Sequence, residues 1–198
     1  MKINREKVEQ LVRTMKPLFT DSSRASQIKT KGACDYVTQV DIQVQKLIKE
    51  GLYQMYPQVQ FMGEEQDNTA IDRKGDFWIL DPVDGTTNLI HDFRHSTLSL
   101  AYAEAGTVEL GIVYQPYTDE MFVAVKGKGA FLNGKPIHVS EAKTLSESLV
   151  TIGTSPYYHE LADWIFKVFK EVFLSCQDIR RLGSAALDMA YVACGRVD

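Results

Sequence analysis

The sequence predicts a layered α/β fold, in which helices and a sheet alternate as in an α+β sandwich. Residues 77–80 are four apolar residues without polar alternation, which is typical of a strand buried on both faces. Apolar residues at helical spacing within 4–19 and 40–52 predict two amphipathic helices. Three strand-like runs separated by turn residues predict an antiparallel meander: 96–105, 108–115 and 121–125.

Local signals predict the remaining elements. Residues 20–34 are polar and predict a loop, and the pair Asn133-Gly134 predicts a hairpin after the meander. An apolar stripe over 161–172 predicts another helix, in which Trp164 would belong to the core. A final helix is expected to open around residues 180–188 and to run to Gly195.

A polar segment at 140–148 predicts a domain boundary. Residues 1–143 would form an N-terminal α+β domain that carries the acidic motifs described below. Residues 144–198 would form the start of a C-terminal α/β domain. With 198 residues, 44% of them hydrophobic, the chain is long enough for one large domain or two small ones.

Composition limits the partners and the compartment. The net charge is −4 and the lysines and arginines do not cluster, which argues against a nucleic-acid groove. Three widely spaced cysteines, Cys34, Cys176 and Cys194, indicate reduced thiols instead of a disulfide framework or a zinc site. The first residues lack the apolar core of a signal peptide, and no run reaches membrane-spanning length. We therefore expect a cytoplasmic protein without a membrane partner.

Acidic residues follow the most apolar strand. The segment Asp81-Pro82-Val83-Asp84-Gly85-Thr86-Thr87-Asn88 places two acids at the carboxyl end of the predicted strand, where layered α/β proteins bind ligands. Two carboxylates ~4 Å apart repel by roughly 4 kcal/mol at an effective dielectric of ~20, so a cation between them is favourable. Oxygen ligands favour Mg²⁺ or Ca²⁺ over zinc. A turn whose aspartates only cap a short helix explains the motif equally well at this point.

A second acidic motif, Gly63-Glu64-Glu65, ends another short apolar run sixteen residues before Asp81. Together with Trp78-Ile79-Leu80 and the following Asp81–Asn88 segment, it resembles the paired signature of the inositol monophosphatase family. Members of that family are Mg²⁺-dependent, lithium-sensitive phosphatases of small sugar and cyclitol phosphates. The resemblance implies the alternating helix–sheet sandwich of the inositol monophosphatase and fructose-1,6-bisphosphatase fold.

The resemblance also implies a set of metal ligands. Glu65 and Asp81 would hold a first Mg²⁺ together with the carbonyl oxygen of Val83. Asp81 and Asp84 would share a second ion, and Glu64 would act through a third, more weakly held metal or its water. Two or three Mg²⁺ ions and inhibition by Li⁺ are therefore expected.

Catalytic and substrate-binding residues follow from the same resemblance. Thr86, hydrogen-bonded to Asp41, would position the attacking water. The N–H groups of Gly85 and Thr86 would hold the phosphate next to Asp84. The residues expected beside the sugar ring are Gly183, Ser184 and Ala185.

Some of these assignments have purely structural alternatives. Thr38 stands three residues before Asp41, which is a helix-capping pattern that explains Asp41 by itself. Small residues at 183–185 also suit a helix start that packs closely against its neighbour. The family places a lysine-bearing mobile loop near the metals, which would correspond to Lys29 or Lys31, although loop lysines are usually only solvated.

The expected reaction is hydrolysis of a phosphate monoester by a metal-activated water. Inositol 1-phosphate is the first candidate substrate; fructose 1,6-bisphosphate and nucleotide phosphates (NADP, 3'-phosphoadenosine 5'-phosphate) are alternatives, as is a non-enzymatic regulatory member of the family. A homodimer is expected. Family members continue past the segment matching 195–198 with a Trp-Asp pair whose aspartate binds metal. We therefore expect the natural protein to be longer.

Overall fold

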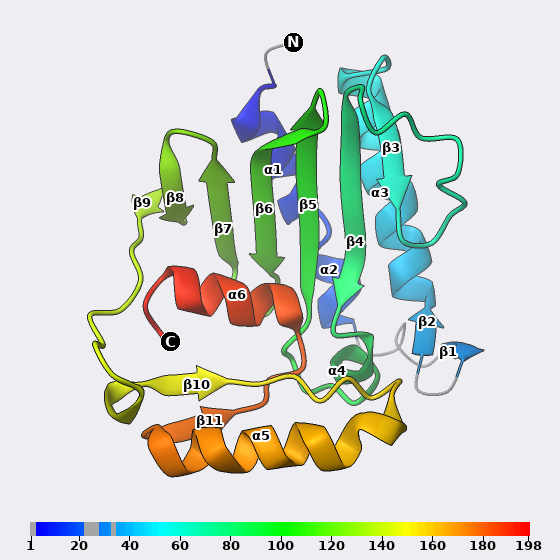
Figure 1. The fold of residues 1–198 in the computed structure, drawn as a ribbon. Coiled ribbons are helices and arrows are strands. Elements are labelled where there is room, and N and C mark those ends of the chain that lie inside the picture. Colours follow the sequence, from blue (N-terminus) through cyan, green and yellow to red (C-terminus); the bar gives the residue numbers. More distant parts are fainter. Residues whose placement is uncertain (1–2, 22–27, 33–34) are drawn as a thin grey trace.

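The computed structural model describes residues 3–21, 28–32 and 35–198, with a seven-stranded sheet at its centre (Figure 1). The strand order is β3-β4-β5-β6-β7-β8-β9, in which β3 and β4 are parallel and all later pairs are antiparallel. The predicted meander and its hairpin are therefore confirmed. The strands are β3 (Gln60–Gly63), β4 (Phe77–Asp84), β5 (Thr97–Glu104), β6 (Thr107–Gln115), β7 (Glu120–Val125), β8 (Gly129–Leu132) and β9 (Lys135–Pro136).

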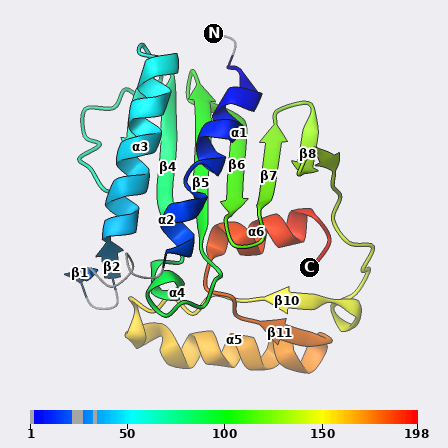
Figure 2. The same cartoon turned by 180° about the vertical axis from the view of Figure 1, so that it is seen from behind.

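Three helices, α1 (Arg5–Arg13), α2 (Lys16–Thr20) and α3 (Gln39–Met55), cover one face of this sheet (Figure 2). Their apolar stripes form the main core with the strands, and each fully buried aliphatic side chain contributes about 1.5–3 kcal/mol. Large side chains that are at most 2% exposed include Val8, Val12, Val44, Ile48, Leu52, Trp78, Leu98, Leu100, Ile112 and Tyr114.

The single helix predicted over 4–19 is wrong, because the structure divides it between α1 and α2. Pro17 lies in the first turn of α2. It has no N–H to donate to the carbonyl of Arg13, and its ring would clash with that carbonyl in a continuous helix. Helix α1 therefore ends at Arg13, with Thr14 as its C-cap, and α2 begins at Lys16.

The loop predicted over 20–34 is also wrong in part. Residues Ile28–Gly32 form β1, which pairs antiparallel with β2 (Asp35–Thr38) just before α3. The polar sequence showed no sign of this hairpin. Two strands can pair through backbone hydrogen bonds alone, without an alternating apolar face. The side chains of Lys29 and Lys31, and the whole of Cys34, lie outside the described residues.

The opposite face of the sheet is covered by α6 (Ala185–Ala193), through a second small core of Phe122, Leu187 and Ala190. Below α6 lies a pair of parallel strands, β10 (Leu149–Thr151) and β11 (Asp178–Arg180), followed by α5 (Ala162–Ser175) (Figure 1). Helices and sheets therefore alternate, which confirms the predicted layered fold. The division at residue 143 stays a prediction.

The helix α5 leaves most of its apolar residues exposed. Trp164 is 66% exposed, so its predicted place in the core is wrong, and within α5 only Ile165 is buried. In Figure 1, α5 lies below β10 and β11, and these short strands leave the rest of its apolar stripe uncovered. In the described part of the chain, no helix combines the length and apolar character needed to cross a membrane.

Candidate active site

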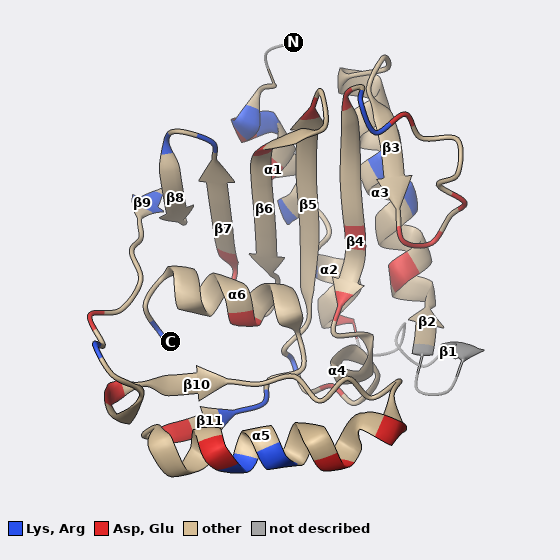
Figure 3. Ribbon diagram, in the orientation of Figure 1, with Lys and Arg blue, Asp and Glu red and all other residues tan. Residues whose placement is uncertain are grey.

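The acidic motif lies at the end of β4, but the strand does not stop at Asp81 as the sequence suggested. It continues to Asp84, with a register shift against β5: Asp81 pairs with Ser99, and Asp84 pairs with Thr97. Three steps on β4 thus match two on β5, which is the geometry of a bulge, and a proline is tolerated there because no ladder donor is needed. The bulge brings both aspartates to the same end of the sheet, on the acidic lower part of β4 (Figure 3).

Gly85 makes the turn that follows. Its φ is +91°, and a Cβ at this position would lie 3.0 Å from the carbonyl oxygen of Gly183 and 3.1 Å from that of His95. A side chain is therefore excluded both by conformation and by space. Gly85 is the N-cap of the short helix α4 (Thr86–Ile90).

Thr86 contacts both Asp41 and the strand end. Its Oγ1 lies 3.3 Å from Oδ1 of Asp41 and 3.0 Å from the carbonyl oxygen of Val83. Asp41 is 2% exposed, and burial raises its pKa above the usual aspartate range. The contact between Thr86 and Asp41 expected from the family resemblance is thus present, across 45 residues of sequence.

Asp41 also closes a capping box with Thr38 at the start of α3. Its Oδ2 accepts hydrogen bonds from the backbone N–H of Thr38 at 2.8 Å and from the Thr38 hydroxyl at 2.6 Å. The structural alternative for Asp41 is therefore also present. The two contacts use different oxygens of the same carboxylate, so they do not compete.

The carboxylates around Asp81 are crowded. Burial, and then the negative charges of Glu64 and Asp84, raise the pKa of Asp81 to about 8. Glu65 lies in the same loop as Glu64, and its backbone N–H donates to Oε1 of Gln45 at 2.9 Å. Helix α3 thus holds the loop that carries both glutamates.

The start of helix α6 contacts Asp84 at the end of β4. Oδ2 of Asp84 accepts hydrogen bonds from the Ser184 hydroxyl at 2.5 Å and from the backbone N–H of Ala186 at 2.7 Å. Ser184 is buried and is the N-cap of α6. Ala185 is exposed. Burial and the charge of Asp84 also raise the pKa of Asp188, one turn further along α6.

Two side-chain amides at the site were not predicted as functional. Gln45 anchors Glu65, and Asn88 donates from Nδ2 to the carbonyl oxygens of His95 at 2.8 Å and Leu182 at 2.7 Å. The second contact fixes the segment before Gly183 against α4. Asn88 is part of the signature itself, so its burial could have been suspected, but its partner is 94 residues away.

The donors at this site suit a hard cation. Carboxylate oxygens of Glu64, Glu65, Asp81 and Asp84 and the carbonyl of Val83 provide only oxygen ligands, and their mutual repulsion favours a positive charge among them. Within the described ranges, no three His, Cys, Asp or Glu side chains already surround a common metal position. A bound cation would therefore have to draw these carboxylates together.

Comparison with protein families identifies the group to which this site belongs. The model of the inositol monophosphatase family matches residues 2–198. The chain belongs to the inositol monophosphatase family. The resemblance inferred from the two acidic motifs is thereby confirmed.

Curated relatives carry different names. An inositol-1-monophosphatase of Rhizobium meliloti (strain 1021) is 37% identical over 172 residues, which cover 87% of this chain and 65% of the relative. Nus factor SuhB of Escherichia coli (strain K12) is 38% identical over 178 residues, which cover 90% of this chain and 66% of the relative. The chain thus spans slightly less than two thirds of the length of these relatives.

Solved structures of the family have the same fold. An inositol monophosphatase of Thermotoga maritima superposes with a TM-score of 0.87 at 35% identity and covers 96% of this chain and 72% of its own. An IMPase/NADP phosphatase complexed with Mg²⁺ and phosphate gives a TM-score of 0.81 at 25% identity, with 95% of this chain and 70% of its own covered.

Proposed function

We propose that the protein is a Mg²⁺-dependent phosphomonoesterase that acts on a small sugar or cyclitol phosphate, with inositol 1-phosphate as the first candidate. The observation that supports this most directly is the cluster of Glu64, Asp81 and Asp84 beside the contact between Thr86 and Asp41. Membership of the family and the Mg²⁺ and phosphate named for one structural relative support the same reaction.

Each ligand in the proposal has a defined task. Glu65, Asp81 and the Val83 carbonyl would hold one ion, and Asp81 with Asp84 would hold a second; Glu64 would serve a third. When bound, Mg²⁺ supplies a water of lowered pKa and stabilises charge on the leaving oxygen. The hydrogen bonds that Asp84 accepts from Ser184 and Ala186 orient its carboxylate, leaving Oδ1 for the ion.

Other residues act on water and substrate. When the Thr86 hydroxyl donates its single hydrogen bond to Asp41 and not to the Val83 carbonyl, the lone pairs of Oγ1 would be free to accept a hydrogen bond from the attacking water. The N–H groups of Gly85 and Thr86, at the start of α4, would donate to the phosphate. Gly183, Ser184 and Ala185 would face the alcohol part of the ester. These roles are proposals.

Replacing Asp81 tests the assignment. Asp81→Asn keeps the side-chain shape and removes one ligand charge, so Mg²⁺-dependent phosphate release from inositol 1-phosphate should fall at least about 100-fold. Burial and the neighbouring carboxylates raise the pKa of Asp81 to about 8, so without metal it carries little charge at about pH 7, and the amide should not lower the melting temperature of the metal-free protein. Asp163→Asn on the exposed surface of α5 is the matched control and should retain full activity. Normal Mg²⁺-dependent turnover by Asp81→Asn would sink the assignment.

A panel of esters separates the remaining substrates. Fructose 1,6-bisphosphate, NADP and 3'-phosphoadenosine 5'-phosphate should be hydrolysed with lower kcat/KM than inositol 1-phosphate. Inhibition by Li⁺ and homodimer formation are further predictions for the same preparation.

A non-enzymatic role is the second candidate, and the relative named Nus factor SuhB is the observation that favours it. A protein of that kind would bind a macromolecular partner and release no phosphate from any ester in the panel. The absence of a nucleic-acid partner, expected from the net charge, is therefore best tested directly, by retardation of labelled RNA.

A further inference from the structure

A cavity of about 590 Å³ lies between α3 and the edge strand β3. Its size falls in the range of small-molecule pockets, roughly 300–1,000 Å³. The floor is apolar, formed by Leu52, Val59, Phe61 and Trp78. None of these residues takes part in the reaction proposed above.

Charges line the α3 side of this cavity. Lys46, Lys49, Glu50 and Tyr53 follow one another at spacings of three, one and three residues, so they share one side of the helix. Two lysines against one glutamate leave the rim positive. An organic molecule that fits this lining has an apolar body and a negative group.

Lys49 brings the positive charge next to the apolar floor. Its Nζ lies 5.5 Å from the centre of the Phe61 ring and donates to Oε1 of Gln66 at 2.8 Å. An ammonium group has three protons, so this hydrogen bond leaves others for an anion. The ammonium and the floor are close enough for one small molecule to contact both.

Trp78 forms part of the apolar floor. It borders the cavity and is 1% exposed, so its indole ring is shielded from bulk water. A molecule that enters the cavity would change the surroundings of this ring, which makes Trp78 a built-in reporter of binding.

We propose that this cavity binds an amphipathic organic anion, with its apolar body on Phe61 and Trp78 and its carboxylate at Lys46 and Lys49. The proposal does not rest on the phosphatase reaction. Its ligand class is set by the lining alone: an apolar floor and a positive rim.

Octanoate is a suitable probe, because it absorbs no light where tryptophan emits. The chain has two tryptophans, and Trp164 is exposed, so Trp164→Phe leaves Trp78 as the only reporter. Octanoate should change the Trp78 emission in a saturable way and shift the single indole N–H resonance. 1-Octanol and octylammonium should bind more weakly than octanoate, because neither is an anion.

Paired variants decide whether the lysines are responsible. In the Trp164→Phe background, Lys46→Gln with Lys49→Gln should weaken octanoate binding about tenfold, because two exposed ammonium groups no longer attract the carboxylate. Lys167→Gln with Lys170→Gln on α5 changes the net charge equally and should leave binding unchanged. Equal weakening by both pairs would refute the proposal, since it would show only a general charge effect.

A change in cavity size provides the remaining test. Ile71 also lines the cavity, and Ile71→Phe should weaken octanoate and octanol alike while the far-ultraviolet circular dichroism spectrum stays unchanged. An emission change that never saturates, or that octylammonium reproduces at the same concentration, would overturn the assignment of this cavity.

Discussion

Asp41 is a buried carboxylate whose two oxygens serve different partners. Oδ2 caps α3 through Thr38, and Oδ1 contacts the hydroxyl of Thr86. A carboxylate that accepts two hydrogen bonds on Oδ2 cannot rotate freely. Its Oδ1 therefore keeps a fixed position relative to the Thr86 hydroxyl. The capping interaction, which explains Asp41 without any function, is also what would orient the catalytic hydroxyl.

Replacement of Thr86 distinguishes water positioning from metal binding. Thr86→Ala keeps every carboxylate, so Mg²⁺ affinity should change little while kcat falls by about 100-fold or more. Calorimetric Mg²⁺ titration and steady-state kinetics on the same preparation measure the two quantities.

Two neighbouring variants serve as controls. Thr86→Ser retains a hydroxyl that can reach Asp41 and should keep most of the activity. Thr87→Ala, at the exposed next residue, should behave as the unaltered protein. Loss of metal affinity in parallel with kcat would show that Thr86 supports the site structurally and does not position water.

Helix α3 connects the start of the chain to both acidic motifs. Thr38 begins it, Asp41 reaches Thr86, and Gln45 one turn later accepts from the backbone of Glu65. Consecutive turns of one helix thus support the two loops that carry the acids. The stability of its first turn should therefore affect the site.

Thr38→Ala tests this connection. Loss of the cap should lower the free energy of unfolding by about 1 kcal/mol. Asp41 Oδ2 then loses one of its two donors, the Thr38 hydroxyl, and keeps the backbone N–H of Thr38. Thr38→Ser keeps the hydroxyl and should lose less than half as much. Urea unfolding measures both variants; equal destabilisation by Ala and Ser would show that the hydroxyl does not stabilise the helix.

Periodic apolar residues were a sufficient guide to α3, and apolar or strand-like runs bounded by turn residues were a sufficient guide to the strands β4 to β7. The pair Asn133-Gly134 indicated the hairpin of β8 and β9. The acids of the site followed from two short motifs, because the motifs lie at strand ends. What the sequence did not reveal depends on distant partners: β11 pairs with β10 almost thirty residues earlier in the chain, and Gln45 and Asn88 hold backbone far away. Trp164 was wrongly predicted to be buried, because helical periodicity shows which side of a helix is apolar but not how much of that side other elements cover.

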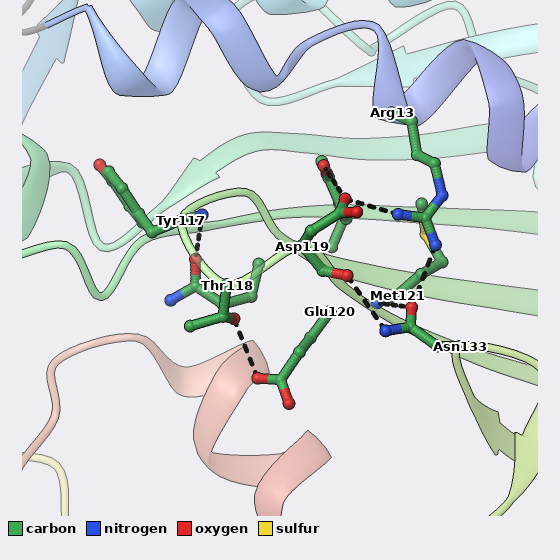
Figure 4. A network of polar contacts seen from close by, with 9 residues as sticks. Arg13, Tyr117, Thr118, Asp119, Glu120, Met121 and Asn133 are labelled. Atoms are coloured by element: carbon green, nitrogen blue, oxygen red, sulfur yellow. Dashed lines mark hydrogen bonds and ion pairs between the residues drawn. The ribbon is translucent and has the colours of Figure 1, made fainter.

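A polar network connects helix α1 to the turn between β6 and β7 (Figure 4). Arg13 of α1 pairs with Asp119 in the turn between β6 and β7 at 2.5 Å and donates to Oδ1 of Asn133 at 3.0 Å. Tyr114 donates its hydroxyl to the same Asp119 oxygen at 2.7 Å. A donor from the sheet and one from a helix therefore meet on one carboxylate.

The Tyr114 hydroxyl, followed by the charge of Arg13, lowers the pKa of Asp119 below the usual range. A carboxyl with a lowered folded-state pKa stabilises the protein above its unfolded pKa of about 4, and that contribution is lost as the pH falls through the folded value. Asp119→Asn should therefore lower the melting temperature at about pH 7, and the difference from the unaltered protein should shrink towards about pH 3.

Melting curves of both proteins across this pH range measure the effect. Tyr114→Phe removes the first donor, so its own melting-temperature deficit should also decrease with acid. A difference for Asp119→Asn that stays constant with pH would mean that the carboxylate is no more stable in the folded protein than in the unfolded one.

The outer strands of the seven-stranded sheet have few free backbone N–H and C=O groups with which another chain could pair. On β3, Gln66 Nε2 donates to the carbonyl of Phe61 at 2.8 Å, and Asn68 exchanges hydrogen bonds with the backbone of Gly63 at 2.7 and 3.2 Å. At the other edge, β9 is two residues long and consists of a lysine and a proline. Such edges resist the edge-to-edge growth that leads to aggregation. Copies of this protein that associate should therefore meet through side-chain surfaces, and no sheet should run from one molecule into the next.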